Sequence, residues 1–305
     1  MSVRFECAVA SAARREPIHA TASQVKAWLL VEVQGSWGRD AVHDSELGPH
    51  APKVWRQAMS SRGVRVITIR RDLDRSSKHT VDGVRVVHVV AGRPGTTVAT
   101  AHRVVLDDLH HVVAATESIA NGHGPDAGWA VDDERYVLVC TNGRHDACCA
   151  TYGRPLVRDL RDGRWAPHVW ECSHIGGDRF AGNLLVLPES LYFGRCHGED
   201  AARILGGLET GRLDLANFRG RSTLPLAEQA AEHYARTELG LHGLDDVVAI
   251  RTVDDGRVEL DLADGRAAVV ALERSRRPSP TPLTCKGAEG LSYPELGLTG
   301  LELLT

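Results

Sequence analysis

The sequence predicts an α/β fold made of two related halves, followed by a small α+β unit. Valine-rich runs bounded by glycine and polar residues recur along the first two thirds of the chain and alternate with helical segments. A short motif follows such a run twice, as Gly38-Arg39-Asp40-Ala41 and as Gly143-Arg144-His145-Asp146-Ala147. The last third shows one helix and several short strands instead. We therefore expect three units, which cover residues 1–128, 129–220 and 221–305.

In the first unit, the valine-rich runs predict strands, and the segments between them predict helices. The expected strands cover 28–33, 64–69 and 84–90. A helix is expected over 52–61, and the segment 101–120 also favours a helix.

The second unit repeats this alternation and adds a hairpin. Strands are expected over 136–140, 168–172, 183–187 and 191–195. Pro188-Glu189-Ser190 is a turn sequence, so we expect the last two strands to pair. Helices are expected over 147–160 and 199–208, the second with acidic residues in its first turn, where the helix dipole favours them.

The third unit begins with a helix whose expected N-cap is Ser222, with Pro225 just inside and Gly240 as the stop. Three short strands are then expected, separated by Asp-Gly turns, over 247–253, 258–262 and 267–272. After Arg276-Arg277-Pro278-Ser279-Pro280 we expect an irregular tail that packs back on the body.

The composition is that of an ordinary globular protein. The chain has 305 residues, 43% of them apolar and 25% charged, which excludes collagen-like, disulfide-knot and disordered classes. The net charge of −4 argues against nucleic-acid and membrane-surface partners. Only four of the 36 basic residues are lysines, which indicates a GC-rich, bacterial genome and carries no weight for function.

The cysteines point to a reduced compartment. The first residues contain no apolar core of a signal peptide, and no stretch reaches the ~18 apolar residues of a membrane span, so we expect a cytoplasmic protein. Four of the seven cysteines fall between positions 140 and 172. In a reduced compartment, clustered cysteines are more often metal ligands or redox catalysts than structural disulfides.

Two strand-to-loop junctions carry the candidate site. Cys140 ends one expected strand, and Cys149 stands at the start of a helix, where free backbone N–H groups favour the thiolate that binds metal. His174 leaves the next strand, Gly176-Gly177 allows a tight turn, and Asp178 follows. Loops at the ends of adjacent strands can converge on one ion or cluster.

The motifs in this region resemble those of the sucrase/ferredoxin-like family. They read Cys-x8-Cys, then Ser-His-x-Gly-Gly-Asp-Arg-Phe-Ala, then Leu-Pro-x-x-Leu-Tyr-Phe-Gly-Arg, between Cys140 and Arg195. The resemblance implies a thioredoxin-like fold and a [2Fe–2S] cluster. By position it implies the ligands Cys140, Cys149, His174 and Asp178. It also implies one-electron transfer with a redox partner protein, either a reductase or a terminal oxidoreductase, and no catalytic residue of the chain's own.

Asp178 departs from the family pattern, which has a second histidine at this position. Asp178 is either the fourth ligand or the hydrogen-bond partner of His174. In the second case the fourth ligand would be Cys172, Cys148 or Cys196; we favour Asp178. Arg144 and Arg179 are expected beside the cluster as cofactor-binding residues, whereas Cys7 and Cys285, remote in sequence, are expected to be packed.

Two further hypotheses remain open. Cys140 and Cys149 could perform thiol–disulfide or peroxide chemistry on the same scaffold. Cysteine and histidine ligands would also suit Zn²⁺, in a binding module without redox turnover. The sequence contains no P-loop, GxGxxG or GxSxG element, so nucleotide-binding and serine-hydrolase functions lack support.

Overall fold

The computed structural model describes residues 5–71 and 83–304, and ten strands of this part form one mixed sheet. The first five are β1 (Ala27–Glu32), β2 (Val64–Arg70), β3 (Val84–Val90), β4 (Thr100–Leu106) and β5 (Ala130–Val131). The next five are β6 (Tyr136–Cys140), β7 (Val169–Cys172), β8 (Leu184–Leu187), β9 (Leu191–Phe193) and β10 (Phe218–Arg221). Their order in the sheet is β10-β9-β8-β6-β7-β2-β1-β3-β4-β5.

Two sets of four strands in this sheet share one pairing pattern. β1 is parallel to β2 and antiparallel to β3, which pairs with β4. Likewise β6 is parallel to β7 and antiparallel to β8, which pairs with β9. The sets meet where β2 and β7 pair antiparallel, at Ile69↔Cys172 and Arg70↔Glu171. The repeated sequence motif follows the first strand of each set.

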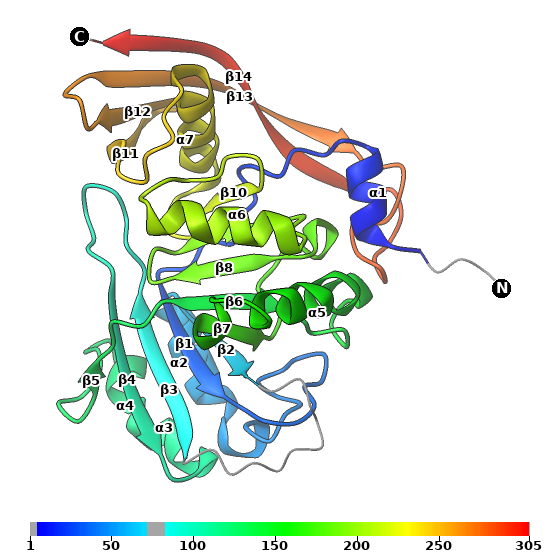
Figure 1. Cartoon of the computed structure of the whole chain (residues 1–305), viewed down its shortest axis with the longest axis vertical. Coiled ribbons are helices and arrows are strands. Elements are labelled where there is room, and N and C mark those ends of the chain that lie inside the picture. The colour runs from blue at the N-terminus through cyan, green and yellow to red at the C-terminus, as the bar shows by residue number, and fades with distance from the viewer. Residues whose placement is uncertain (1–4, 72–82, 305) are drawn as a thin grey trace.

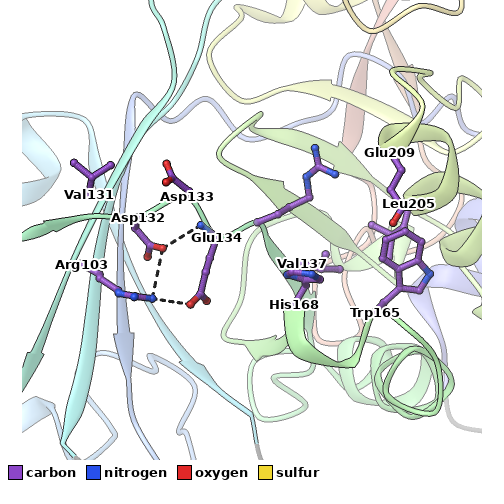
Figure 2. Close-up of a pocket in the computed structure, with 11 residues that line it drawn as sticks. Arg103, Val131, Asp132, Asp133, Glu134, Val137, Trp165, His168, Leu205 and Glu209 are labelled. Carbon is purple, nitrogen blue, oxygen red and sulfur yellow. Dashed lines mark hydrogen bonds and ion pairs between the residues drawn. The ribbon is translucent and has the colours of Figure 1, made fainter.

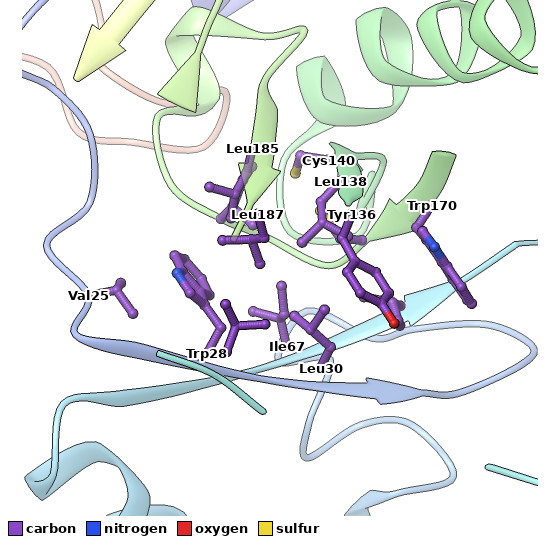
Figure 3. Packing of buried hydrophobic residues seen from close by; sticks show 14 of the residues in the cluster. Val25, Trp28, Leu30, Ile67, Tyr136, Leu138, Cys140, Trp170, Leu185 and Leu187 are labelled. Carbon is purple, nitrogen blue, oxygen red and sulfur yellow. The ribbon is translucent and has the colours of Figure 1, made fainter. Parts of the chain in front are cut away.

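Two apolar layers cover opposite faces of the β6–β9 strands. In Figure 3, Trp28, Leu30 and Ile67 of the first set face Leu138 and Leu185 of the second, and all five are buried. On the other face lie the helices α5 (Ala147–Arg161) and α6 (Gly198–Glu209). Burial of these side chains on both faces explains why the strands read as continuous apolar runs.

The remaining helices of this region are short. They are α1 (Cys7–Ala13), α2 (Lys53–Ser61), α3 (Val112–Ala115) and α4 (Glu117–Ala120). The predicted helix over 101–120 is therefore wrong in its first part, which is β4. The run of residues 100–106 pairs with β3 along its whole length, and this long-range pairing decides the conformation of a locally ambiguous segment.

The C-terminal unit packs α7 (Leu226–Leu239) on a separate antiparallel sheet (Figure 1). Its strands, in order, are β11 (Val247–Asp254), β12 (Arg257–Leu262), β13 (Ala267–Pro278) and β14 (Ser292–Leu304). Gly240 ends the helix in a left-handed conformation, as expected. Ser222 is not the N-cap, because the helix begins only at Leu226 and the Ser222 hydroxyl donates to Val25 O instead.

The expected irregular tail is wrong. β13 runs on to Pro278, and β14 pairs with it from Ala267↔Leu304 to Pro278↔Ser292. The proline-rich stretch ends β13 and begins the connection to β14. The C-terminal residues are ordered because β14 pairs with β13. The expected boundaries at 128 and 220 stay predictions. Across residues 5–71 and 83–304, no helix combines the length and apolar character that spanning a bilayer requires.

Candidate metal centre

The end of β6 and the start of α5 place the two predicted cysteine ligands together. Cys140 is the last residue of β6, and Cys149 lies in the first turn of α5. Asp146 caps this helix, since its side chain accepts a hydrogen bond from Cys148 N at 2.9 Å. The helix can approach the strand end because residue 153 is glycine: a Cβ there would lie 2.1 Å from Cys140 O.

The loop after β7 brings His174 and Asp178 to the same point. Gly176 and Gly177 adopt positive φ angles of 97° and 82°, a conformation that favours glycine. The buried Arg219 guanidinium donates to Gly176 O at 3.0 Å, and a Cβ at Gly177 would collide with it at 2.3 Å. Arg65 donates to His174 O at 2.7 Å. The loop is therefore held from two sides by arginines.

The four residues predicted as ligands lie close together. Sγ of Cys140, Sγ of Cys149 and a ring nitrogen of His174 all lie within 4.8 Å of one another. Asp178 Oδ1 lies 2.9 Å from His174 Nδ1 and accepts a hydrogen bond from Cys149 Sγ at 3.2 Å. The cysteines are buried, whereas the His174 side chain is 21% exposed. The arrangement offers two buried thiol sulfurs and a buried carboxylate, together with an imidazole that is partly exposed.

His145 belongs to the same group of residues and is absent from the sequence-based prediction. Its ring stacks on that of His174 with centroids 3.7 Å apart, and its Nε2 lies 3.8 Å from Asp178 Oδ2. His145, His174 and Asp178 form a second donor set within 4.8 Å, which shares His174 with the cysteine set. The sequence held a signal for it, because His145 is the one residue that the second copy of the repeated motif adds to the first.

The titratable groups of the site are coupled to one another through hydrogen bonds and charge. The hydrogen bond from Cys149, together with His174, holds the pKa of Cys140 well below its ordinary range despite burial. The pKa of Cys149 is raised by the same hydrogen bond and by burial. Burial disfavours a charged His174, but its contacts with Asp178 and Cys140 outweigh this and raise its pKa to about 9. Burial likewise opposes the ionised Asp178, yet contact with His174 lowers its pKa.

The three alternative fourth ligands lie outside the donor set of Cys140, Cys149 and His174, although Cys172 pairs with Cys140 in the sheet. The donor sets found in the described residues include neither Cys172 nor Cys196; both thiols are buried, and burial raises their pKa values. Cys148 turns away from Cys149, and its Sγ lies 3.4 Å from that of Cys285. Cys7 is packed as expected, whereas Cys285 is only partly buried, and both thiols lie beside Cys148. Their meeting depends on both ends of the chain folding back, which no local pattern encodes.

The two arginines predicted near the cofactor differ in their surroundings. Arg179 Nε donates to Glu16 Oε1 at 2.6 Å, and its charge is matched there. Arg144 is exposed and lines a cavity of about 500 Å³ together with Arg70, Lys286 and Trp37. The role of Arg144 and Arg179 in cofactor binding stays a prediction.

Two other cavities differ in their relation to the site. One of about 430 Å³ is lined by His145 and His174, so it opens onto the exposed side of the donor group. Another, of about 510 Å³, is shown in Figure 2 and is lined by none of the predicted site residues. There Arg103 lies 2.6 Å from Glu134 and 3.7 Å from Asp132, so the charges are already paired.

Comparison with known proteins places the chain in a family. The sequence profile described as sucrase/ferredoxin-like matches residues 18–220, about two thirds of the chain. The chain belongs to the sucrase/ferredoxin-like family. The matched residues contain the whole donor group and both sets of paired strands, and they end before α7. No solved structure matches the chain.

Curated relatives of this family member are yeast proteins named Altered inheritance of mitochondria protein 32. The Meyerozyma guilliermondii protein is 32% identical over 81 residues, which cover 24% of this chain and 29% of that protein. The Candida glabrata protein is 26% identical over 106 residues, which cover 30% of this chain and 34% of that protein. The Saccharomyces cerevisiae protein is 28% identical over 96 residues, which cover 27% of this chain and 31% of that protein. The chain thus spans about a third of the length of each.

These names overturn the predicted function. The sequence predicts a one-electron transfer protein carrying a [2Fe–2S] cluster, whereas the matched relatives are named for the inheritance of mitochondria and not as electron carriers. Because the relatives are yeast proteins, they also give no support to the expected bacterial origin. The family description leaves the activity of its members open.

Proposed function

We propose that this chain is a metal-binding protein whose metal centre is held by Cys140, Cys149, His174 and Asp178. The observation that carries the proposal is the convergence of the two strand-end loops on one buried group of donors. The sulfur and nitrogen atoms of its cysteine half all lie within 4.8 Å of one another. Thiols and imidazoles grouped in this way are typical ligands of transition metals.

The donor group divides by chemistry into two parts. Cys140 and Cys149 supply two thiol sulfurs, whereas His174, with His145 and Asp178 beside it, supplies nitrogen and oxygen donors. A soft, sulfur-rich half beside a nitrogen and carboxylate half fits a binuclear centre. We therefore propose a [2Fe–2S] cluster as the cofactor, which when bound supplies iron that can change its oxidation state. The electron-carrier role is not part of this proposal.

The chain's own residues prepare the site. Asp178 Oδ1 lies 2.9 Å from His174 Nδ1, so its negative charge stabilises the imidazole beside the thiols. Arg65 and Arg219 hold the loop that carries His174 by donating to its backbone carbonyls. The buried position of Cys140 and Cys149 excludes water from the sulfur side, while the cavity at His145 and His174 leaves the other side accessible.

We also propose a fold for the two strand sets. The identical pairing of β1–β4 and of β6–β9 supports two tandem, thioredoxin-like halves, of which only the second carries the donor group. In this scheme the first half closes the apolar layer behind the site and supplies Arg65. A cytoplasmic location, in which the thiols stay reduced, fits the same scheme. The partner protein, a reductase or a terminal oxidoreductase, stays a prediction.

Metal and sulfide analysis tests the proposal. The full chain purified without oxygen should contain about two irons and two acid-labile sulfides and should be coloured. Cys149→Ser should lose both. Cys172→Ser is the matched control, because Cys172 is equally buried but lies outside the donor sets. One zinc that depends on Cys149 would overturn the cluster but keep the metal site. A metal-free protein with titratable Cys140 and Cys149 thiols would overturn the proposal as a whole.

A further inference from the structure

A second group of cysteines lies on the other side of the start of α5. It joins Cys7 of α1, Cys148 of α5 and Cys285 of the connection between β13 and β14, with Asp146 beside them. In Figure 1, α1 lies next to this connection, although the two are at opposite ends of the sequence. Three thiols from three distant segments therefore meet at one carboxylate.

The distances within this group match those of a tetrahedral zinc site. Cys148 Sγ lies 3.4 Å from Cys285 Sγ, which lies 3.6 Å from Cys7 Sγ. Cys7 Sγ lies 3.7 Å from Asp146 Oδ1, and all four donor atoms lie within 4.8 Å of one another. Ligand bonds of ~2.0 to 2.3 Å place the corners of a tetrahedron about 3.3 to 3.8 Å apart. Little movement is needed to close these four donors around one ion.

Asp146 aligns the segments that carry the thiols. Its Oδ1 accepts from Cys148 N at 2.9 Å, and its Oδ2 accepts from Cys285 N at 2.8 Å. One carboxylate thus fixes the backbone at two of the three cysteines. Apolar side chains surround the group, including Ala8 and Ala181, and Cys7 and Cys148 are buried. Cys285 is partly exposed, and four protein donors would leave no open ligand position, as in structural zinc sites.

This group is distinct from the centre at Cys140 and Cys149. Consecutive residues of a helix point about 100° apart because the helix has 3.6 residues per turn. Accordingly Cys149 contacts Asp178, whereas Cys148 contacts Cys285. The two donor groups share no residue.

We propose that Cys7, Cys148, Cys285 and Asp146 form a structural Zn²⁺ site, which fastens both ends of the chain to the start of α5. Three sulfur ligands and one carboxylate oxygen, in a closed tetrahedral arrangement, favour Zn²⁺ over Mg²⁺ or Ca²⁺, which prefer oxygen ligands. Because Cys7 and Cys285 are 278 positions apart in the sequence, one ion would crosslink nearly the whole chain.

Reloading with zinc alone tests this site. The full chain carrying Cys140→Ser, which removes a ligand of the first centre, is stripped of metal under reducing conditions and dialysed against Zn²⁺. We expect one zinc per chain. Adding Cys7→Ser or Cys285→Ser should abolish it, whereas adding Cys196→Ser should not, because Cys196 is buried outside both donor groups.

A second measurement needs no variant of the site. In the reduced protein, zinc should protect Cys285, the partly exposed cysteine of the group, from alkylation, and a chelator should remove the protection. Zinc content unchanged by Cys7→Ser and Cys285→Ser would overturn the proposal. So would a native Cys148–Cys285 disulfide in a zinc-free protein purified without oxygen. Failure of the first centre would instead be seen as a wild-type protein without iron whose zinc still depends on Cys7.

Discussion

Asp178 Oδ1 lies 2.9 Å from His174 Nδ1 and also accepts a hydrogen bond from Cys149 Sγ at 3.2 Å. One carboxylate therefore contacts both halves of the donor group. The family pattern that the sequence resembles has a second histidine at this position. In this chain Asp178 can supply a ligand oxygen and also stabilise a charged imidazole, and the two roles can be separated by experiment.

Substitution Asp178→Asn should lower the pKa of His174 in the metal-free protein. Contact with the carboxylate and with Cys140 raises this pKa to about 9, against the effect of burial. With the negative charge removed, burial should dominate and bring the pKa down towards the ordinary ~6.5. NMR titration of the imidazole measures it, with the exposed Asp264→Asn as control. A pKa that stays near 9 would show that Asp178 does not stabilise the charged ring.

Substitution Arg219→Lys should destabilise the loop that carries His174. Arg219 is buried and donates to Gly176 O, Asn183 Oδ1 and Thr21 Oγ1 at 2.8 to 3.0 Å. A lysine ammonium cannot reproduce this planar arrangement of donors. We expect the free energy of unfolding to fall by about 2 to 4 kcal/mol and metal content to fall with it. Urea unfolding tests this against the exposed Arg158→Lys; equal stabilities of the two variants would contradict it.

The buried pair between Arg70 and Glu171 should stabilise the junction of the two strand sets. Arg70 Nη2 lies 3.1 Å from Glu171 Oε2, which also accepts from Thr141 Oγ1 at 2.6 Å. Glu171→Ala leaves a buried guanidinium unpaired, so it should lower the free energy of unfolding by about 3 to 5 kcal/mol. The double variant Arg70→Met, Glu171→Leu should lose less than Glu171→Ala alone. A double-mutant cycle in urea, built from Arg70→Met, Glu171→Leu and their combination, measures the coupling, and strictly additive losses would refute it.

His88 should contribute to acid sensitivity between pH 6.5 and about 4. Burial, with a smaller effect of His102, lowers the pKa of His88 to about 4. The folded state therefore keeps His88 neutral while the unfolded state takes up a proton below the ordinary ~6.5. The stabilisation is present above pH 6.5 and is lost as the pH falls to about 4, by at most about 3 kcal/mol.

His88→Leu should flatten this part of the stability curve without removing the slope entirely. The partly buried His19 has a pKa lowered to about 3 and acts in the same direction. Unfolding free energies of the two proteins at pH 7, 5.5 and 4 test the prediction. A wild-type curve as flat as that of the variant would contradict it.

Local patterns in the sequence predicted most of the secondary structure around the site. The strands over 136–140 and 84–90 agree with the structure residue by residue, and the turn after Leu187 makes the expected hairpin. These elements are short and apolar and are bounded by glycine or proline, so their conformation depends on neighbours in sequence. Cys140 and His174 could be selected because each lies at a strand-to-loop junction, whereas the full ligand set with Cys149 and Asp178 followed from the resemblance to the family motifs.

Contacts between distant segments decided the rest. β4 and β14 are strands because each pairs along its whole length with another strand, β4 with β3 and β14 with β13. The local sequence at residues 100–106 and 292–304 does not determine this pairing. The same holds for the cysteines. The sequence by itself determined that Cys148 and Cys149 would start a helix beside a strand end. Only the tertiary structure decided that Cys149 faces His174 and Asp178 while Cys148 faces Cys7 and Cys285, because that depends on both chain ends folding onto α5.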